Sequence, residues 1–178
     1  MIVKSLKLKN YRNYEYLNME FGSETNILYG DNAQGKTNIL EALYMSGTTK
    51  SHRGTKEKDI IRFGKEESHI ETRVEKRGIP FQIDMHLKKN AAKGIAVNKI
   101  PLKKAGELFG IIHFVLFSPE DLNIIKEGPA GRRRFLDLEL SQLDKVYLNN
   151  LSNYNKTLNQ RNALLKEIAY QEKGQDLL

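Results

Sequence analysis

The sequence predicts an α/β fold, and three observations lead to this class. First, a short apolar segment, a glycine-rich loop and a helical pattern follow one another between residues 26 and 44. Second, apolar residues alternate with polar ones before and after this unit, which is the period of a half-buried strand. Third, the end of the chain carries apolar residues at intervals of three or four, as an amphipathic helix does. We therefore expect strands around one loop–helix unit, followed by helix.

The first thirty residues predict three strands. Residues 2–9 alternate between apolar and basic side chains, and residues 14–21 follow after a polar turn. Residues 26–29 are short, apolar and end at Gly30, as a strand buried on both faces would. From Lys36 the apolar residues fall at helical spacing, so that a helix follows the glycine loop.

The middle of the chain predicts a second group of strands. Residues 47–66 are polar and basic and indicate a loop with at most a short helix. Residues 68–74 and 81–87 alternate, which predicts an antiparallel hairpin with one solvated face, closed by the turn at residues 76–78. Residues 93–100 are expected to form a further edge strand.

The last part of the chain predicts a buried strand and then helix. Residues 111–117 are continuously apolar, and Ser118 followed by Pro119 is typical of a helix start. Beyond Gly131 the spacing of apolar residues predicts one long amphipathic helix. Its apolar stripe runs from Leu140 to Ile168. Such a stripe needs a partner helix, because one helix cannot bury its own apolar face.

Composition describes a protein with enough apolar material for a core. Of 178 residues, 39% are hydrophobic and 29% are charged, which suits one domain or a domain plus part of a second. No stretch approaches the roughly 20 apolar residues of a membrane helix, and the N-terminus lacks a signal-peptide pattern. With no cysteine there is no disulfide, and a cytoplasmic protein without membrane association fits best.

The net charge of +7 favours a polyanionic partner such as nucleic acid, although an indifferent basic surface explains it equally well. Three clusters contribute to the charge. For the first two, a solvated face is the alternative to contact with phosphate groups. At the third, arginine at a helix start opposes the helix dipole, which indicates an ion pair or a phosphate contact. The clusters are Lys50/His52/Arg53/Lys56/Lys58/Arg62, Lys88/Lys89/Lys93/Lys99/Lys103/Lys104 and Arg132/Arg133/Arg134.

The glycine loop matches the phosphate-binding pattern G-x-x-x-x-G-K-[ST] at every fixed position. Glycine permits backbone angles that let successive N–H groups surround phosphate oxygens, and the following helix points its positive end at the same anion. Lys36 supplies a point charge, and the Thr37 hydroxyl is a hard oxygen ligand for Mg²⁺. The candidate site comprises Gly30, Asp31, Asn32, Ala33, Gln34, Gly35, Lys36, Thr37 and Asn38. For Asn32, a plain turn role is the alternative. The pattern predicts a bound purine nucleoside triphosphate with Mg²⁺.

The residues around the loop resemble the RecF family, the bacterial recombination mediators related to the ATP-binding heads of structural-maintenance-of-chromosomes proteins. The resemblance covers nearly the whole chain. It rests on MIVKSLKLKNYRNYEYLNMEF, GDNAQGKTNILEALYM, SHR at residues 51–53 and FSPEDL…GPAGRRRFLD at residues 117–137. The resemblance implies an ABC-type α/β head with a mixed sheet and antiparallel strands. Residues 1–130 would be its N-terminal part, and residues 131–178 the start of an inserted helical domain.

The same resemblance implies the ligands and partners. Arg12 and Asn13 would lie near the base or ribose, with a plain turn as the alternative. His52 would contact nucleotide or a dimer partner. Family members dimerise on ATP, bind DNA at single-strand/double-strand junctions and work with RecR and RecO in DNA repair, recombination, replication and the SOS response.

Two family elements are missing from this sequence. We find neither a signature motif of the LSxGQ type nor four apolar residues leading directly into an acidic pair, the Walker B pattern. RecF-like proteins are also about twice as long, so we expect an N-terminal fragment that binds nucleotide weakly and hydrolyses it little.

Two other classes of function remain open at this stage. A small kinase would transfer the γ-phosphate to a metabolite, although the strands at residues 68–87 argue against it. A nucleotide-dependent docking module would use the same loop without turnover.

Overall fold

The computed structural model describes residues 1–118 and 128–175. The chain divides into two compact units, Met1–Pro119 and Glu120–Leu178, and each is described by itself.

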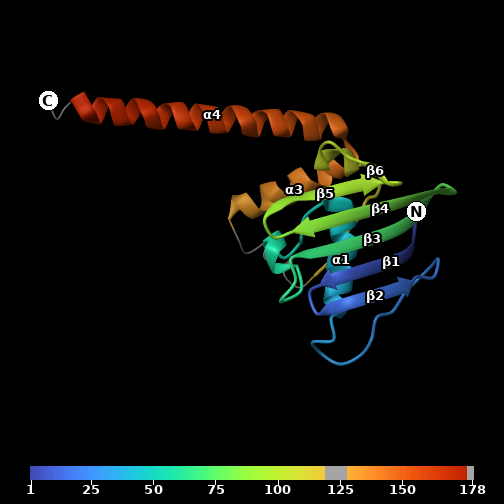
Figure 1. The fold of residues 1–178 in the computed structure, drawn as a ribbon. Coiled ribbons are helices and arrows are strands. Elements are labelled where there is room, and N and C mark those ends of the chain that lie inside the picture. The colour runs from blue at the N-terminus through green and yellow to red at the C-terminus, as the bar shows by residue number, and fades with distance from the viewer. Residues whose placement is uncertain (119–127, 176–178) are drawn as a thin grey trace. The chain divides into compact units, whose positions relative to one another are not determined.

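The first unit is built on a six-stranded sheet (Figure 1). The strands lie in the order β2-β1-β3-β4-β5-β6, and each neighbouring pair is antiparallel. Their bounds are β1 Ile2–Tyr11, β2 Tyr14–Glu20, β3 Glu67–Lys76, β4 Ile79–Lys88, β5 Ala91–Val97 and β6 Ile100–Pro101. The two expected strands at residues 2–9 and 14–21 are confirmed, as is the hairpin at residues 68–87. Arg77 and Gly78 close this hairpin with positive φ angles, which is what a two-residue turn requires.

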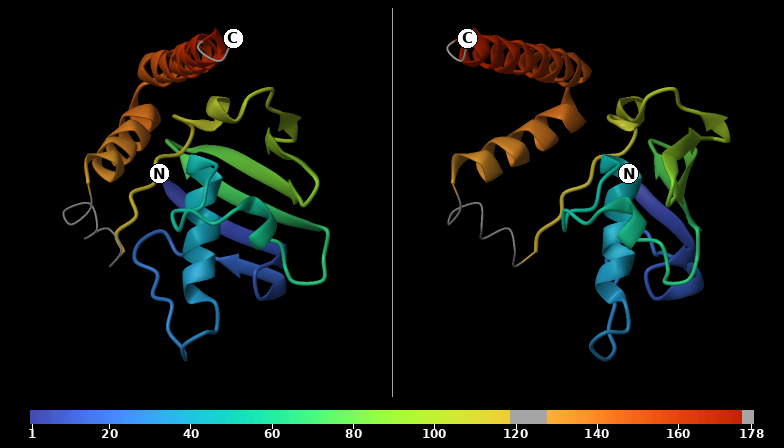
Figure 2. Two further views of the ribbon diagram at one scale, coloured as in Figure 1. Left: turned by 90° about the vertical axis from the view of Figure 1, so that its left-hand side faces the viewer. Right: turned by 60° about the vertical axis from the view of Figure 1, so that its left-hand side comes forward.

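The helix α1 (Lys36–Thr48) lies across one face of this sheet (Figure 2). Alternate residues of β3 and β4 point to this face and form the core with the helix. They include Ile70, Thr72, Val74, Ile83, Met85 and Leu87 from the strands, and Ile39, Ala42 and Met45 from α1. The opposite face carries polar contacts across the strands, such as the Lys7–Glu71 ion pair and the contact of His69 with Asp84. The predicted solvated face is therefore confirmed.

The connection from α1 to β3 contains only a short 3-10 turn, η1 (Glu57–Asp59), as the polar composition of residues 47–66 indicated. A second such turn, η2 (Ala105–Leu108), follows β6. The strand expected at residues 93–100 is also present, but it divides into β5 and the short β6.

Two segments that we expected to be buried strands are not strands. In residues 26–29, Ile27 and Tyr29 are 78% and 91% exposed. In residues 111–117, Ile112 is buried, but Val115 and Phe117 are 89% and 82% exposed. A strand covered on both faces needs paired neighbours, and none of the six strands within residues 1–118 pairs with either segment. Ile112 forms one isolated bridge with Phe109, but neither segment has the neighbouring strand that the backbone of a buried strand requires.

The second unit consists of helices α3 (Pro129–Leu143) and α4 (Lys145–Gln175) in its described part. The prediction of one long helix is therefore wrong. Asp144 has extended backbone angles, and its Oδ1 accepts a hydrogen bond of 2.7 Å from the Val146 N–H, so that it ends α3 and caps α4. The Tyr147 hydroxyl donates to Asp137 Oδ1 at 2.6 Å and ties the two helices together.

The helix start expected at Ser118 and Pro119 falls on residues 119–127, outside the described part of the chain. Within that part, no helix combines the length and the apolar character of a membrane span.

Candidate functional site

The glycine loop and the first turn of α1 have the backbone geometry of an anion site. Gly30, Ala33 and Gly35 adopt positive φ angles of 140°, 65° and 99°. Gly35 is the N-cap of α1, and no side chain accepts a hydrogen bond from the helix start there. The first N–H groups of the helix and its positive dipole end are therefore available to an anion. The loop predicted from sequence thus combines positive φ angles with a helix start that no side chain caps.

Lys36 lies folded into the mouth of the loop. Its Nζ donates to the carbonyl oxygens of Gly30 at 2.7 Å and Asp31 at 2.5 Å. These neutral acceptors hold the ammonium group beside the N–H groups of the loop. A phosphate oxygen carries a negative charge and is a stronger acceptor for an ammonium group than a carbonyl. Lys36 is therefore positioned to exchange loop carbonyls for phosphate.

The turn between β1 and β2 supports the loop from the side. Asn13 Nδ2 and the Tyr14 hydroxyl both donate to the Gln34 carbonyl, at 3.1 Å and 3.2 Å. A Cβ on Gly35 would lie 2.7 Å from both side chains, so glycine is needed here for space as well as for its φ angle. Of the sequence-predicted pair, Asn13 contacts the phosphate loop, whereas the Arg12 side chain bonds to Glu41, Thr55 and the Asp59 carbonyl.

Behind this turn lies a buried carboxylate that sequence reasoning missed. Glu41 of α1 is fully buried and accepts hydrogen bonds from Arg12 Nε (2.9 Å), Arg12 Nη2 (2.6 Å), Ser51 Oγ (2.5 Å) and Tyr11 Oη (3.2 Å). Burial by itself raises the pKa of Glu41, but the hydrogen bonds from Arg12 and Ser51 outweigh it and hold the pKa below its usual range. The sequence did contain a signal for Glu41, because an acidic residue four positions after Thr37 falls on the apolar face of the helix.

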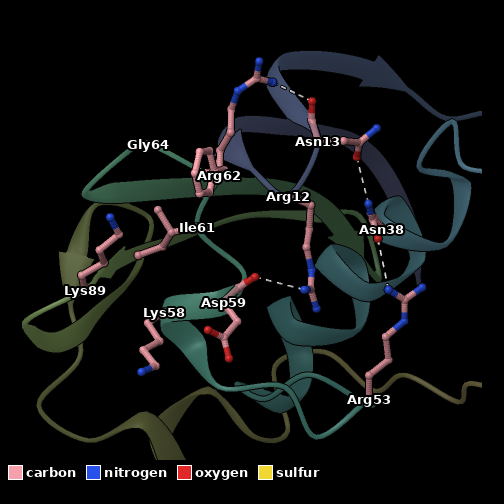
Figure 3. Close-up of a pocket in the computed structure, with 11 residues that line it drawn as sticks. Arg12, Asn13, Asn38, Arg53, Lys58, Asp59, Ile61, Arg62, Gly64 and Lys89 are labelled. Atoms are coloured by element: carbon pink, nitrogen blue, oxygen red, sulfur yellow. Dashed lines mark hydrogen bonds between the residues drawn. The ribbon is translucent and has the colours of Figure 1, made fainter.

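A cavity of about 790 Å³ lies beside the first turn of α1 (Figure 3). Asn13 and Asn38 form its edge toward the phosphate loop, and Asp59 is the one carboxylate among its lining residues. The side chain of Phe63 also lines it and is fully exposed. The cations that line it are Arg12, Arg53, Lys58, Arg62 and Lys89. A cavity with this balance of charge suits an anionic or polar ligand.

The structure redistributes the basic clusters that the sequence grouped together. Arg53, Lys58 and Arg62 of the first cluster share the cavity with Lys89 of the second. Lys93 of the second cluster is instead engaged inside the unit, where it pairs with Glu57 and donates to the Thr49 carbonyl at 2.6 Å.

The third cluster lies at the start of α3, as expected. All three arginines, Arg132 to Arg134, are exposed, and none pairs with an acidic residue of the described chain. The expected contact of at least one of them therefore stays a prediction. His52 lies edge-on to Tyr44, with 5.7 Å between the ring centres.

Comparison with known proteins shows which family of ATPases this chain belongs to. Residues 1–177 match the family model of the AAA ATPase domain, and the chain therefore belongs to that family.

Within this class the chain is similar to RecF proteins. It is 70% identical over 170 residues to the DNA replication and repair protein RecF of Agathobacter rectalis, and 60% identical over 178 residues to that of Lachnoclostridium phytofermentans. These matches cover 96% and 100% of this chain, but 47% and 49% of the relatives. The chain thus spans about half the length of the curated relatives that it matches, and the resemblance seen in the sequence is confirmed.

Solved structures agree with this assignment. The structure described as the recombination mediator protein RecF-ATP in the RecFOR pathway superposes with a TM-score of 0.90 at 41% identity, over 94% of this chain and 45% of that one. A structure of SMC ATPases matches with a TM-score of 0.62 at 16% identity, over 81% of this chain and all of the other. The second likeness concerns the fold alone. The expected fold class, an α/β ATPase head, is confirmed.

Proposed function

We propose that this chain binds ATP with Mg²⁺ through the loop at residues 30–37, as the ATP-binding part of a RecF-type DNA repair protein. The observation that carries the proposal is the loop itself, with its positive φ angles, the helix start free of a capping side chain, and Lys36 in its mouth. The likeness to a RecF structure described with ATP supports the choice of nucleotide.

Each part of the loop has a role that its chemistry suggests. The backbone N–H groups of the loop and of the α1 start would hold the phosphate oxygens. Lys36 would exchange the Gly30 and Asp31 carbonyls for phosphate, and the exposed Thr37 hydroxyl would ligate Mg²⁺.

The cavity beside α1 is the proposed place of the nucleoside. Arg12 and Asn13 both line it, and Asn13 also bonds to the loop at Gln34. This agrees with the role near base or ribose that the family resemblance implies for the pair. The whole-protein activities follow the same resemblance: an ATP-dependent homodimer, DNA contact at single-strand/double-strand junctions, RecR and RecO partners, and a cytoplasmic location. Residues 1–130 would then be the first part of the head, and residues 131–178 the start of its helical second domain.

The test is ATP titration by calorimetry with the wild-type chain and the Lys36→Ala variant. Loss of a charged hydrogen-bond donor costs about 1.5–3 kcal/mol, so the affinity should fall about tenfold to a hundredfold. Lys103→Ala removes an equal charge at an exposed position outside the loop and the cavity, and should bind ATP as the wild type does. Absence of ATP binding by the wild type, or equal binding by the Lys36→Ala variant, would refute the proposal.

A nucleotide-dependent docking module is the second candidate, favoured by one observation. The helices of the second unit expose large apolar side chains, among them Leu143 (74%), Val146 (66%) and Tyr154 (62%). Exposed apolar rows of this kind are typical of surfaces that pack on another helix. ATP-dependent sedimentation of a longer RecF-type protein, without DNA, would favour docking over DNA repair activity.

A further inference from the structure

Hydrogen bonds, together with the peptide link between Arg12 and Asn13, join six residues around the first turns of α1 into a closed circuit. Glu41 holds the Arg12 guanidinium with two bonds, and the next residue, Asn13, accepts from Asn38 Nδ2 at 2.8 Å. Asn38 Oδ1 in turn accepts from Arg53 Nη1 at 3.2 Å, and Figure 3 shows both bonds of Asn38. The Arg53 N–H donates to Ser51 Oγ at 3.1 Å, and Ser51 Oγ donates to Glu41. We call this set the Glu41 ring: Glu41, Arg12, Asn13, Asn38, Arg53 and Ser51.

The two ends of the ring differ in burial. At one end the Glu41 side chain is fully buried, and the Arg12 side chain that it holds is only 17% exposed. At the other end the contacts among Asn13, Asn38 and Arg53 are exposed. Charge-assisted bonds away from water are stronger and more restrictive than neutral bonds at the surface. The Glu41 end therefore anchors the ring, and the exposed hydrogen bonds of Asn38 break more easily.

The exposed end of the ring forms part of the candidate site. Asn13 also donates to the Gln34 carbonyl of the phosphate loop, and Asn38 lies in the first turn of α1. Four ring members, Arg12, Asn13, Asn38 and Arg53, line the cavity beside the loop. Arg12 itself has a positive φ of 51°, a conformation that its side-chain bonds to Glu41, Thr55 and the Asp59 carbonyl retain.

We infer that Glu41 is a positioning residue for nucleotide recognition. Its carboxylate fixes the turn at residues 12–13 and the loop at residues 51–53 on either side of the α1 start, and so sets the shape of the cavity that receives the nucleoside. This inference rests on the proposed ATP-binding function. Glu41 acts at a distance, because its own side chain is buried and the ring carries its effect to the cavity.

The test separates positioning from simple stabilisation by using two ligands. Phosphate groups are held by the loop backbone and Lys36, whereas the nucleoside depends on the ring. Calorimetry with ATP and with inorganic tripolyphosphate should therefore respond differently in the Glu41→Gln variant. We expect ATP affinity to fall about tenfold or more, on the scale of one lost charged hydrogen bond, with tripolyphosphate affinity nearly unchanged.

Ser46→Ala is the matched control for stability. Ser46 lies on the same helix, is fully buried, and bonds to Thr72 Oγ1 at 2.6 Å and to the Ala42 carbonyl, but it has no bond to the ring. This variant should lower the unfolding temperature without changing the affinity for either ligand. Because Glu41→Gln leaves Arg12 without its carboxylate, Ser51→Ala serves as a milder second variant that opens the ring without removing a charge. It should weaken ATP binding in the same direction by a smaller factor.

Each outcome supports or overturns a specific statement. If the wild type binds neither ligand, the proposed function fails. If it binds ATP and both ring variants bind ATP equally well, or if Glu41→Gln weakens ATP and tripolyphosphate by the same factor, the positioning role is wrong. Hydrogen exchange gives an independent readout: in Glu41→Gln the amides of residues 12–13 and 51–53 should exchange faster together, whereas in Ser46→Ala they should not.

Discussion

At the scale of single residues, the site depends on a few side chains whose surroundings decide their state. Glu41 is kept ionised by Arg12 and Ser51 although burial opposes its charge. Its charge in turn helps burial to raise the pKa of Tyr11, which therefore stays a neutral hydrogen-bond donor. Lys36 and Thr37, in contrast, lie where solvent and ligand can reach them. The buried group around Glu41 sets the geometry of the site, whereas Lys36 and Thr37 are placed to contact the nucleotide.

The state of Glu41 predicts a pH dependence of stability. Its folded pKa lies below its ordinary value of 4.5, so its contribution is present above pH 4.5 and is lost as the pH falls through the lower folded value. Glu41→Gln should lower the free energy of unfolding at neutral pH by about 1–3 kcal/mol, because Arg12 loses its partner. Urea titrations at several pH values should show this difference narrowing below pH 4.5. Parallel curves for the two proteins would contradict the assignment.

Gly35 predicts a loss of both stability and binding when it is replaced. Alanine at a φ of 99° is strained, and its Cβ would press on Asn13 and Tyr14. We expect Gly35→Ala to cost about 1–2 kcal/mol in the free energy of unfolding and to weaken ATP binding. Gly128 has a φ of −68° and open space around its Cα, so Gly128→Ala should leave ATP binding unchanged. Denaturant titration with calorimetry measures both effects, and equal behaviour of the two variants would count against the strained loop.

At the scale of elements, hydrogen-bond partners decided which predicted segments formed. The alternating segments became β1, β3 and β4, because each found a neighbouring strand. The apolar runs at residues 26–29 and 111–117 did not, although their side chains suit a strand. The predicted single helix divides where Asp144 supplies a cap, which the apolar stripe on either side concealed.

The break at Asp144 makes a prediction for the second unit. Removing the capping carboxylate by Asp144→Ala leaves the Val146 N–H without its partner and should destabilise the start of α4 by about 1 kcal/mol. Helix content by circular dichroism and the thermal midpoint should both fall slightly. Asp144→Ser retains a capping oxygen and should restore most of the loss. A variant with alanine that is as stable as the serine variant would show that the cap is unimportant.

At the scale of the whole molecule, the net charge and two sequence patterns that we do not find lead to predictions about activity. The +7 charge of the chain and the cluster of cations around the cavity favour anionic partners. The sequence also shows neither a Walker B pattern nor a signature motif, the elements that would supply the acid and complete the γ-phosphate site. Binding of ATP and of DNA backbone are therefore the properties to measure on this chain.

The hydrolysis prediction follows directly from those missing elements. The purified chain should release phosphate from ATP at a rate near that of buffer, even at saturating nucleotide. A coupled phosphate assay measures this rate, with Lys36→Ala as the background. Steady release that disappears in the variant would show that the chain holds a complete catalytic site.

The DNA prediction concerns salt. Contacts between lysine or arginine and phosphate release counterions, so DNA affinity should fall steeply between low and moderate salt, about tenfold for only a few such contacts. Fluorescence anisotropy with a duplex bearing a single-stranded end measures the slope. Lys56→Ala, at an exposed cation of the first basic cluster outside the cavity, should reduce that slope. A flat salt dependence would exclude backbone contact.

The sequence by itself determined the local features: the loop at residues 30–37, the helix that follows it, the alternating hairpins and the ATPase class. These depend on glycine angles and side-chain periods, which act between near neighbours along the chain. Only the tertiary structure decided that Glu41 accepts hydrogen bonds from Arg12 and Tyr11, which lie 29 and 30 residues away. It alone brings Asn13 and Arg53 into hydrogen-bond contact with Asn38. It also decided that two apolar runs remain without strand neighbours. The physical reason is that burial and strand pairing depend on residues far away in the chain, whose positions no local pattern contains.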